Sequence, residues 1–405
     1  MTGSDLNIPF DPLSWEEWKS QVEKELKGKS YNEFLTWTND ASITIESWQN
    51  TLPETLADLP SVSEPWKILE PIYEQDAKQA NDLALNALNQ GAEAIWFQKS
   101  FKGAAAEVAV KGIDQNIAPV FIQKETLSDP FEVLLKTGDA KIFKDHRPLL
   151  INGKRLRERG ANELLELAAL MSQCIEVCDK YGYDSDITIL TSIGTNYLTE
   201  IAKLRALRWI WNSILKQKSV DAPVKVIAIN LTNNYAQNDE HTNILRASSA
   251  AMSAVVGGAN YLMIQPWDAH WKAPNDFSAR ISRNIQVLLK EESHMDKNTN
   301  AADGAYFIEN LTTEMAKKAW DMIQCIEQNG GFSEYAKSKQ LFTDIEHNAS
   351  QLMEAYSKEK ALLGVNKFLP REVNSETAPK SSTYELLPSY LSIPHQIQLM
   401  HDEWF

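Results

Sequence analysis

Four basic side chains stand within six residues in the sequence KRLRER, at positions 154–159. The segment follows RPLLING, an apolar run of the length expected for a buried strand. Arginine and lysine can bind a phosphate group, and barrel enzymes hold their functional residues in the loops after strands. The pattern is also typical of a charged loop and helix start. The segment therefore predicts either a phosphate site or a charged surface.

The other residues that could carry chemistry are scattered. The seven histidines are His146, His241, His270, His294, His347, His395 and His401. No two of them have the spacing of metal ligands on one helix, so packed or solvated histidines are expected. Cys174 and Cys178 lie four apart in a helical pattern, which indicates neither zinc nor a disulfide and is typical of a reducing compartment. No serine or cysteine nucleophile motif stands out.

Charge and composition exclude some classes of partner. The chain has 405 residues, with 55 acidic and 40 basic side chains and a formal net charge of -15. Such a charge repels polyanions, so neither a nucleic acid nor an anionic membrane is an expected partner. The N-terminus has neither the basic flank nor the apolar core of a secretory signal, and no apolar run approaches the roughly 18 residues of a membrane span. We expect a cytoplasmic protein.

Short apolar runs alternate with helical stretches from Trp66 onward. The runs are AEAIWF, APVFIQ, RPLLING, ITILTSI, VKVIAIN and ANYLMIQPW. This alternation predicts an α/β fold with parallel strands, and about 300 residues suit a TIM (β/α)8 barrel. An open doubly wound sheet also fits the alternation, although no GxGxxG or P-loop sequence follows any run.

An N-terminal arm, residues 1–62, precedes the predicted barrel of residues 63–370, and residues 371–405 form a linker and tail. SWEEWKSQVEKELKG has the cap, acidic first turn and terminal glycine of a helix. The arm also holds four tryptophans, namely Trp15, Trp18, Trp37 and Trp48. These rings are expected to pack either on the barrel or on another chain. In the second case, deleting residues 1–60 should leave a folded barrel.

The stretch YLTEIAKLRALRWIW, residues 197–211, has charged residues placed so that a helix formed by it would have no face made only of polar side chains. Its charged residues spread round the helix, with apolar residues in the gaps between them. A helix that packs on both sides must hold its charges in pairs between two surfaces. Glu200 and Lys203 have the spacing of helix neighbours.

This stretch resembles a signature of the methylmalonyl-CoA mutase family, and further segments follow in the family's order. They are TNILRASSAAMSAVVGGANYLMIQPWD, FSARISRNIQVLLKEESH, ADGAYFIENLT, AWDMIQCIEQNGG and GVNKF, with NGKRLRERGANELLELA upstream. The resemblance covers residues from about 60 to 370. The arm, with its WEEW and LKGK, is similar to the start of the family's small subunit.

The resemblance implies a TIM barrel, which in catalytic subunits is followed by a flavodoxin-like cobalamin domain. An Asp-x-His-x-x-Gly motif, whose histidine ligates cobalt, identifies that domain, and this sequence lacks it. Residues 371–405 are too few for such a domain. This chain is therefore expected to bind no cofactor, and adenosylcobalamin is expected in a partner subunit.

The barrel also departs from the family pattern where chemistry would be expected. Lys154 and Arg155 stand where catalytic subunits carry the tyrosine and histidine that face the acyl group. Asp186 and Thr188 replace an arginine and a serine that grip coenzyme A, and the carboxylate would repel a phosphate. An Arg-Thr-His-Ser-Gln run corresponds to residues 227–231, and an active-site tyrosine falls near Pro71. The replacements predict a barrel axis filled by apolar side chains.

The resemblance therefore implies the small, non-catalytic subunit of a heterodimeric methylmalonyl-CoA mutase, an isomerase of propionate metabolism. Its partner would be a large catalytic subunit, and the four tryptophans would belong to the interface. Two alternatives stay open. One is a self-sufficient barrel lyase or isomerase that acts on a phosphorylated or CoA substrate through residues 154–159, and the other is a CoA-binding regulatory homodimer. An open polar barrel mouth favours the enzyme, whereas a plugged barrel favours the subunit.

Overall fold

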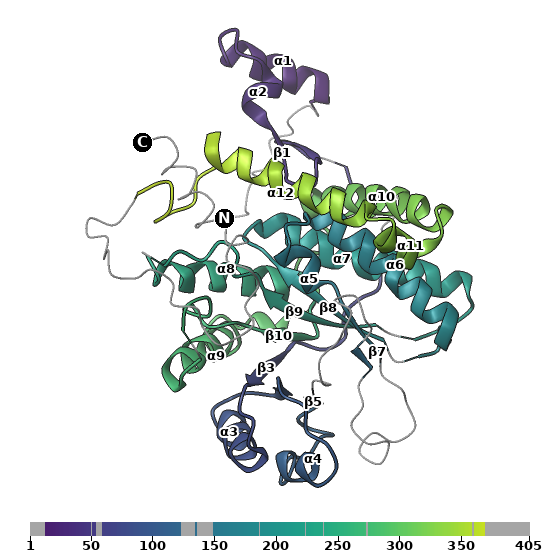
Figure 1. The fold of residues 1–405 in the computed structure, drawn as a ribbon. Helices are drawn as coiled ribbons and strands as arrows, with labels where there is room; N and C mark the ends of the chain where they lie inside the picture. Colours follow the sequence, from purple (N-terminus) through teal and green to yellow (C-terminus); the bar gives the residue numbers. More distant parts are fainter. Residues whose placement is uncertain are drawn as a thin grey trace, which may run out of the picture.

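The centre of the molecule is a curled sheet covered by helices (Figure 1). The computed structural model describes residues 13–49, 51–53, 59–122, 134–135, 149–185, 187–222, 224–237, 239–272, 274–358 and 360–368. Two features of the sequence prediction, Asp186 and the tail of residues 371–405, lie outside the described residues.

Seven strands of the sheet run parallel, and one short strand is antiparallel to its neighbour. The parallel strands are β3 (Lys67–Ile72), β4 (Ala94–Phe97), β5 (Val120–Ile122), β7 (Leu149–Asn152), β8 (Ile187–Ile193), β9 (Lys225–Asn230) and β10 (Tyr261–Met263). The antiparallel strand is β6 (Leu134–Leu135), which pairs with β7. All six apolar runs identified in the sequence contain one of the parallel strands.

The order of the strands distinguishes a barrel from an open sheet. It is β5-β4-β3-β10-β9-β8-β7-β6, so β10, the last strand of the succession, lies beside β3, the first. Tyr261 is in register with Lys67, and Leu262 with Ile68. A doubly wound sheet keeps its first and last strands apart, whereas a barrel closes by bringing them together. The predicted TIM-like barrel is therefore confirmed, and the described part contains seven parallel strands of the expected eight.

Helices follow the strands and cover the outside of the sheet. They are α3 (Ala77–Asn89), α4 (Ala104–Ala109), α5 (Lys154–Glu158), α6 (Glu163–Tyr181), α7 (Tyr197–Gln217), α8 (Thr242–Val256) and α9 (Asp276–Glu291). Apolar side chains of α6, α7 and α8 form the largest core cluster with the outward faces of β8 and β9. The fold therefore buries one face of each strand against helices and the other inside the barrel.

An outer layer of helices explains the unusual charges of residues 197–211. This layer consists of α10 (Tyr306–Gln328), α11 (Gly331–Lys337) and α12 (Gln340–Lys358), and α10 packs against α6 and α7 (Figure 1). Helix α7 thus lies between the sheet and α10. Its charged residues Glu200, Lys203, Arg205 and Arg208 are 0%, 1%, 6% and 8% exposed. The predicted pairing of charges between two packed surfaces is confirmed, since Lys203 contacts Glu200 at 2.7 Å.

The described part of the N-terminal arm begins with two helices that project from the barrel. These are α1 (Trp15–Glu25) and α2 (Tyr31–Leu35), and Figure 1 shows them beyond α12. Ser14 and Glu17 form a capping box at the start of α1, as the sequence predicts. No residue of α1 is buried. The helix therefore contributes no side chain to the core of the barrel.

The second half of the arm packs on the barrel. Strands β1 (Thr36–Thr38) and β2 (Thr44–Glu46) form a hairpin, and Ile43 and Ile45 belong to the main core cluster. The Asn39 amide donates to the Thr199 hydroxyl at 3.2 Å. A deletion of residues 1–60 would therefore remove core side chains as well as the projecting helices. This changes the expectation that such a deletion leaves the barrel intact.

Candidate functional site

The basic segment 154–159 forms α5 at the carboxyl end of β7, where barrel enzymes place their chemistry. Arg157 donates to Glu163 at 2.8 Å and to Glu200 at 3.1 Å. Lys154 forms an ion pair with Glu158 at 2.7 Å. Two of the four predicted phosphate-binding cations are thus held by carboxylates of the same chain, which weakens the phosphate interpretation of this segment.

A buried ion network lies beneath the same strand ends. The Lys203 ammonium contacts Glu166 at 2.6 Å and Glu200 at 2.7 Å, and it donates to the Ser192 carbonyl. Glu166 also accepts from the Thr191 hydroxyl and the Ser192 amide, both at 2.9 Å. Burial alone would lower the pKa of Lys203, but the two carboxylates raise it above its ordinary value. The ammonium therefore stays charged in the folded protein.

This network is placed to hold elements together, because its groups have no access to a ligand. The side chains of Glu166, Glu200 and Lys203 are at most 1% exposed, and they join α6 and α7 to the end of β8. Burial raises the pKa of Glu200 despite Lys203 and Arg157. A buried ion pair adds little net stability, but removing one partner leaves an uncompensated charge.

The barrel axis is filled by apolar side chains. Ten buried residues on the inward faces of the parallel strands form one cluster, namely Leu69, Ala94, Trp96, Phe121, Leu150, Leu190, Ile227, Ile229, Tyr261 and Met263. Phe121 packs edge-on against Tyr261 at 5.2 Å between ring centroids. The prediction that Ile227 and Ile229 bring bulk to the axis is confirmed. Leu231 instead lines a small cavity at the carboxyl edge, beside Arg157.

Polar groups at the carboxyl ends of β9 and β10 bond to one another. Asn230 donates to the Tyr235 hydroxyl at 2.6 Å and accepts from the Gln265 amide at 2.6 Å. A ring nitrogen of His270 lies 2.6 Å from the Thr232 carbonyl. Burial lowers the pKa of His270, so its ring is neutral near pH 7. These groups therefore satisfy one another's hydrogen bonds at the carboxyl ends of the two strands.

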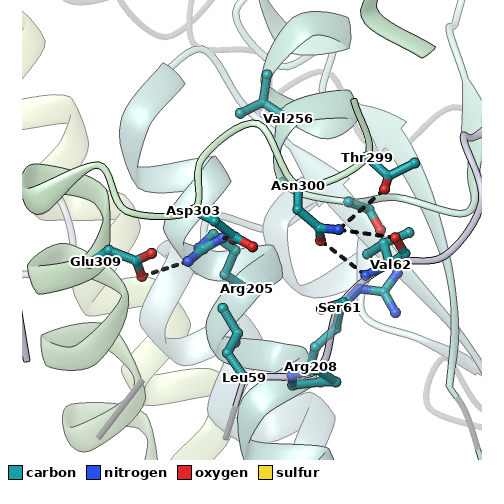
Figure 2. A pocket seen from close by; sticks show the side chains of 13 residues that line it. Leu59, Ser61, Val62, Arg205, Arg208, Val256, Thr299, Asn300, Asp303 and Glu309 are labelled. Atoms are coloured by element: carbon teal, nitrogen blue, oxygen red, sulfur yellow. Dashed lines mark hydrogen bonds and ion pairs between the residues drawn. The ribbon is translucent and has the colours of Figure 1, made fainter. Parts of the chain in front are cut away.

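Two of the cavities that border the described part of the barrel are small. One, of about 180 Å³, lies at the amino-terminal ends of the strands (Figure 2). The other, of about 90 Å³, lies between α5 and α12. Sites for drug-sized ligands usually have roughly 300–1,000 Å³. Neither cavity could hold coenzyme A or a cobalamin.

The described residues contain no group of three or more histidine, cysteine or acidic side chains placed to hold a metal ion. None of their helices combines the length and apolar character needed to cross a membrane. Cys174 and Cys178 are buried on α6, and burial raises the pKa of both thiols.

Three of the four predicted interface tryptophans form one cluster on the arm. Trp18 stacks on Trp15 and Trp48, with ring centroids 5.2 and 5.0 Å apart, and Tyr31 meets Trp18 edge-on. All three rings are partly exposed. Trp37 lies apart on β1 and is 49% exposed. The structure thus brings three of the four residues together, and their role at an interface stays a prediction.

Sequence reasoning missed several residues that organise this region. Glu166 was not identified as the partner of Lys203, which lies 37 positions away in sequence, and Glu163 was not identified as the partner of Arg157. The available signal was Glu163 and Glu166 in the otherwise apolar first half of α6. The amino-terminal cavity was also missed, since its walls come from four separate segments, namely 59–62, 205–208, 256–258 and 299–309.

Residues 133–386 match the family model described as methylmalonyl-CoA mutase. The methylmalonyl-CoA mutase small subunit of Porphyromonas gingivalis is 26% identical, over 89% of this chain and 70% of that protein. The large subunit from the same organism is 29% identical, over 67% of this chain and 41% of its own length. The methylmalonyl-CoA mutase of Cereibacter sphaeroides is 32% identical over 54% of this chain. That match covers 33% of the length of the Cereibacter sphaeroides protein.

Proposed function

Because this chain belongs to the methylmalonyl-CoA mutase family, we propose that it is the small, non-catalytic subunit of a heterodimeric mutase that interconverts methylmalonyl-CoA and succinyl-CoA. A large subunit would hold adenosylcobalamin, which supplies the radical for the rearrangement. This chain would stabilise that partner. We place the complex in the cytoplasm, in accord with the few, unpaired cysteines of this chain.

The filled barrel axis is the observation that carries this proposal. A mutase must admit an acyl-CoA to the barrel, and here the inward positions hold side chains such as Trp96, Phe121 and Ile229. Each of the three is at most 4% exposed. The described residues therefore do not fit coenzyme A or the cofactor, and no step of the reaction is assigned to them.

Two further observations favour a subunit over a self-sufficient enzyme. The relatives that the chain resembles include proteins named small and large subunits in one organism. The projecting helices α1 and α2 carry Trp15, Trp18 and Tyr31, which with Trp48 form an aromatic cluster whose three indole rings are partly exposed. Aromatic anchors of this kind are enriched at protein interfaces. We assign this cluster, together with Trp37, to the contact with the large subunit.

A ligand-binding measurement tests the closed barrel. We expect coenzyme A at micromolar concentration to leave the thermal midpoint of the isolated chain unchanged, because stabilisation requires a site in the folded state. Differential scanning fluorimetry measures this, and the separately purified large subunit is the positive control. A saturable rise in the midpoint of this chain would show an open site and would contradict the proposal.

A further inference from the structure

The cavity of about 180 Å³ lies at the amino-terminal face of the barrel, away from the mouth described above. Figure 2 shows its walls, which come from α7, from residues 59–62 ahead of β3, from the end of α8 and from the start of α10 with the loop before it. The Asn300 side chain joins two of these walls, since it accepts from the Val62 amide at 3.0 Å and donates to the Val62 carbonyl at 3.1 Å.

Two arginines on one face of α7 line this cavity, and their charges are balanced differently. Arg205 contacts Asp303 and Glu309, each at 2.5 Å, so its terminal nitrogens are matched by two carboxylates. Glu309 also accepts from the Gly304 amide at 2.8 Å. Both acidic residues of the cavity wall are therefore held by Arg205.

Arg208 has only neutral partners among the described residues. Its guanidinium donates to the carbonyls of Val224 and Gly258 and to the Asn260 side chain, the last at 2.8 Å. Burial lowers the pKa of Arg208 to about 10. A buried charge normally has a counter-charge, because desolvation without one is costly.

Each of the two arginines also has an unused donor. In the part of the chain that the structure describes, Nε of Arg205 and Nε of Arg208 are buried without a hydrogen-bond partner. Buried donors of this kind are rare in native proteins and call for a missing acceptor. Ser61 and Thr299 add hydroxyl groups to the same wall. The cavity thus combines an uncompensated cation, spare donors and hydroxyls.

We propose that this cavity is a binding site for a small oxyanion of the inorganic phosphate class, held mainly by Arg208. Its volume equals that of roughly six waters, which is enough for one such ion and part of its hydration. Guanidinium groups and hydroxyls suit oxyanion geometry. The ion would contact residues 59–62, which connect the arm to β3, and would thereby fix the base of the arm to α7.

A charge placed at the cavity wall tests this proposal without disturbing the core. Ser61 lines the cavity and is exposed, so Ser61→Asp should fold and supply Arg208 with a carboxylate. We expect isothermal titration of the wild-type chain with inorganic phosphate to give a saturable one-site isotherm. Ser61→Asp should weaken this binding at least about tenfold. Sodium chloride at matched ionic strength serves as the reference titrant.

Ser63→Asp is the matched control, because it adds the same charge two residues away, at an exposed position outside the cavity wall. Its phosphate affinity should stay within about twofold of wild type. Equal loss in both variants would indicate a general effect of net charge and would overturn the site. The absence of saturable binding to the wild-type chain would also overturn it, and would mean that the cavity holds water alone.

Discussion

Replacing Lys203 by methionine should lower the free energy of unfolding by about 3–5 kcal/mol, which is the usual effect of breaking a buried charge pair. Lys203 is 1% exposed and lies within 2.7 Å of both Glu166 and Glu200. Without the ammonium, Arg157 alone would face three buried carboxylates. Urea unfolding followed by circular dichroism gives the free energy directly.

Lys317→Met is the control for this experiment. Lys317 pairs with Glu314 at 3.1 Å on α10, but both side chains are well exposed. Exposed pairs of this kind contribute about 0–1 kcal/mol, so this variant should remain close to wild type. Similar losses in the two variants would mean that the buried network does not hold α6 and α7 to β8.

Replacing Trp18 by alanine should weaken association with the large subunit by about 2 kcal/mol or more, which is about 30-fold in the dissociation constant. Trp18 stacks on both Trp15 and Trp48, which also stack on each other, and Tyr31 meets its edge. The barrel should be unaffected, because Trp18 lies on a helix without buried residues. Analytical gel filtration and titration calorimetry with the large subunit measure the loss.

Ile117→Ala is the matched control, because Ile117 is 72% exposed and lies three residues before β5. Figure 1 shows β5 at the opposite end of the molecule from α1 and α2. It should leave the affinity for the partner unchanged.

A deletion of residues 1–30 should also keep a native far-UV spectrum and lose the partner, whereas deletion of 1–60 should destabilise the barrel through loss of Ile43 and Ile45. Unchanged affinity of Trp18→Ala would place the interface elsewhere.

The barrel could be predicted because its strands are short apolar runs that alternate with helices, a local pattern in the sequence. The pairing of β10 with β3 could not be read locally, since it joins Tyr261 to Lys67 and so the last parallel strand to the first. The packing of α10 on α7 likewise brings together segments that are far apart in the sequence. The charges of residues 197–211 nevertheless signalled a helix packed on two sides, and the structure confirms it.

The candidate site was only partly predictable. The bulk of Ile227 and Ile229 at the barrel axis follows from side-chain alternation along one strand together with the family resemblance. The acid partners of Lys203 and Arg157 depend on how α5, α6 and α7 meet, which no spacing in the sequence specifies. For the same reason, the sequence identified the arginines at 205 and 208 without indicating that they line a cavity.

The cobalamin content of the assembled complex tests the central claim most directly. This chain and a large subunit would be purified separately and together, and bound adenosylcobalamin would be measured by its absorbance beside methylmalonyl-CoA turnover. We predict about one cobalamin per heterodimer, retained wholly by the large subunit, and no turnover by this chain alone, since its barrel axis is filled. Stoichiometric cobalamin or turnover in the isolated chain would contradict the account.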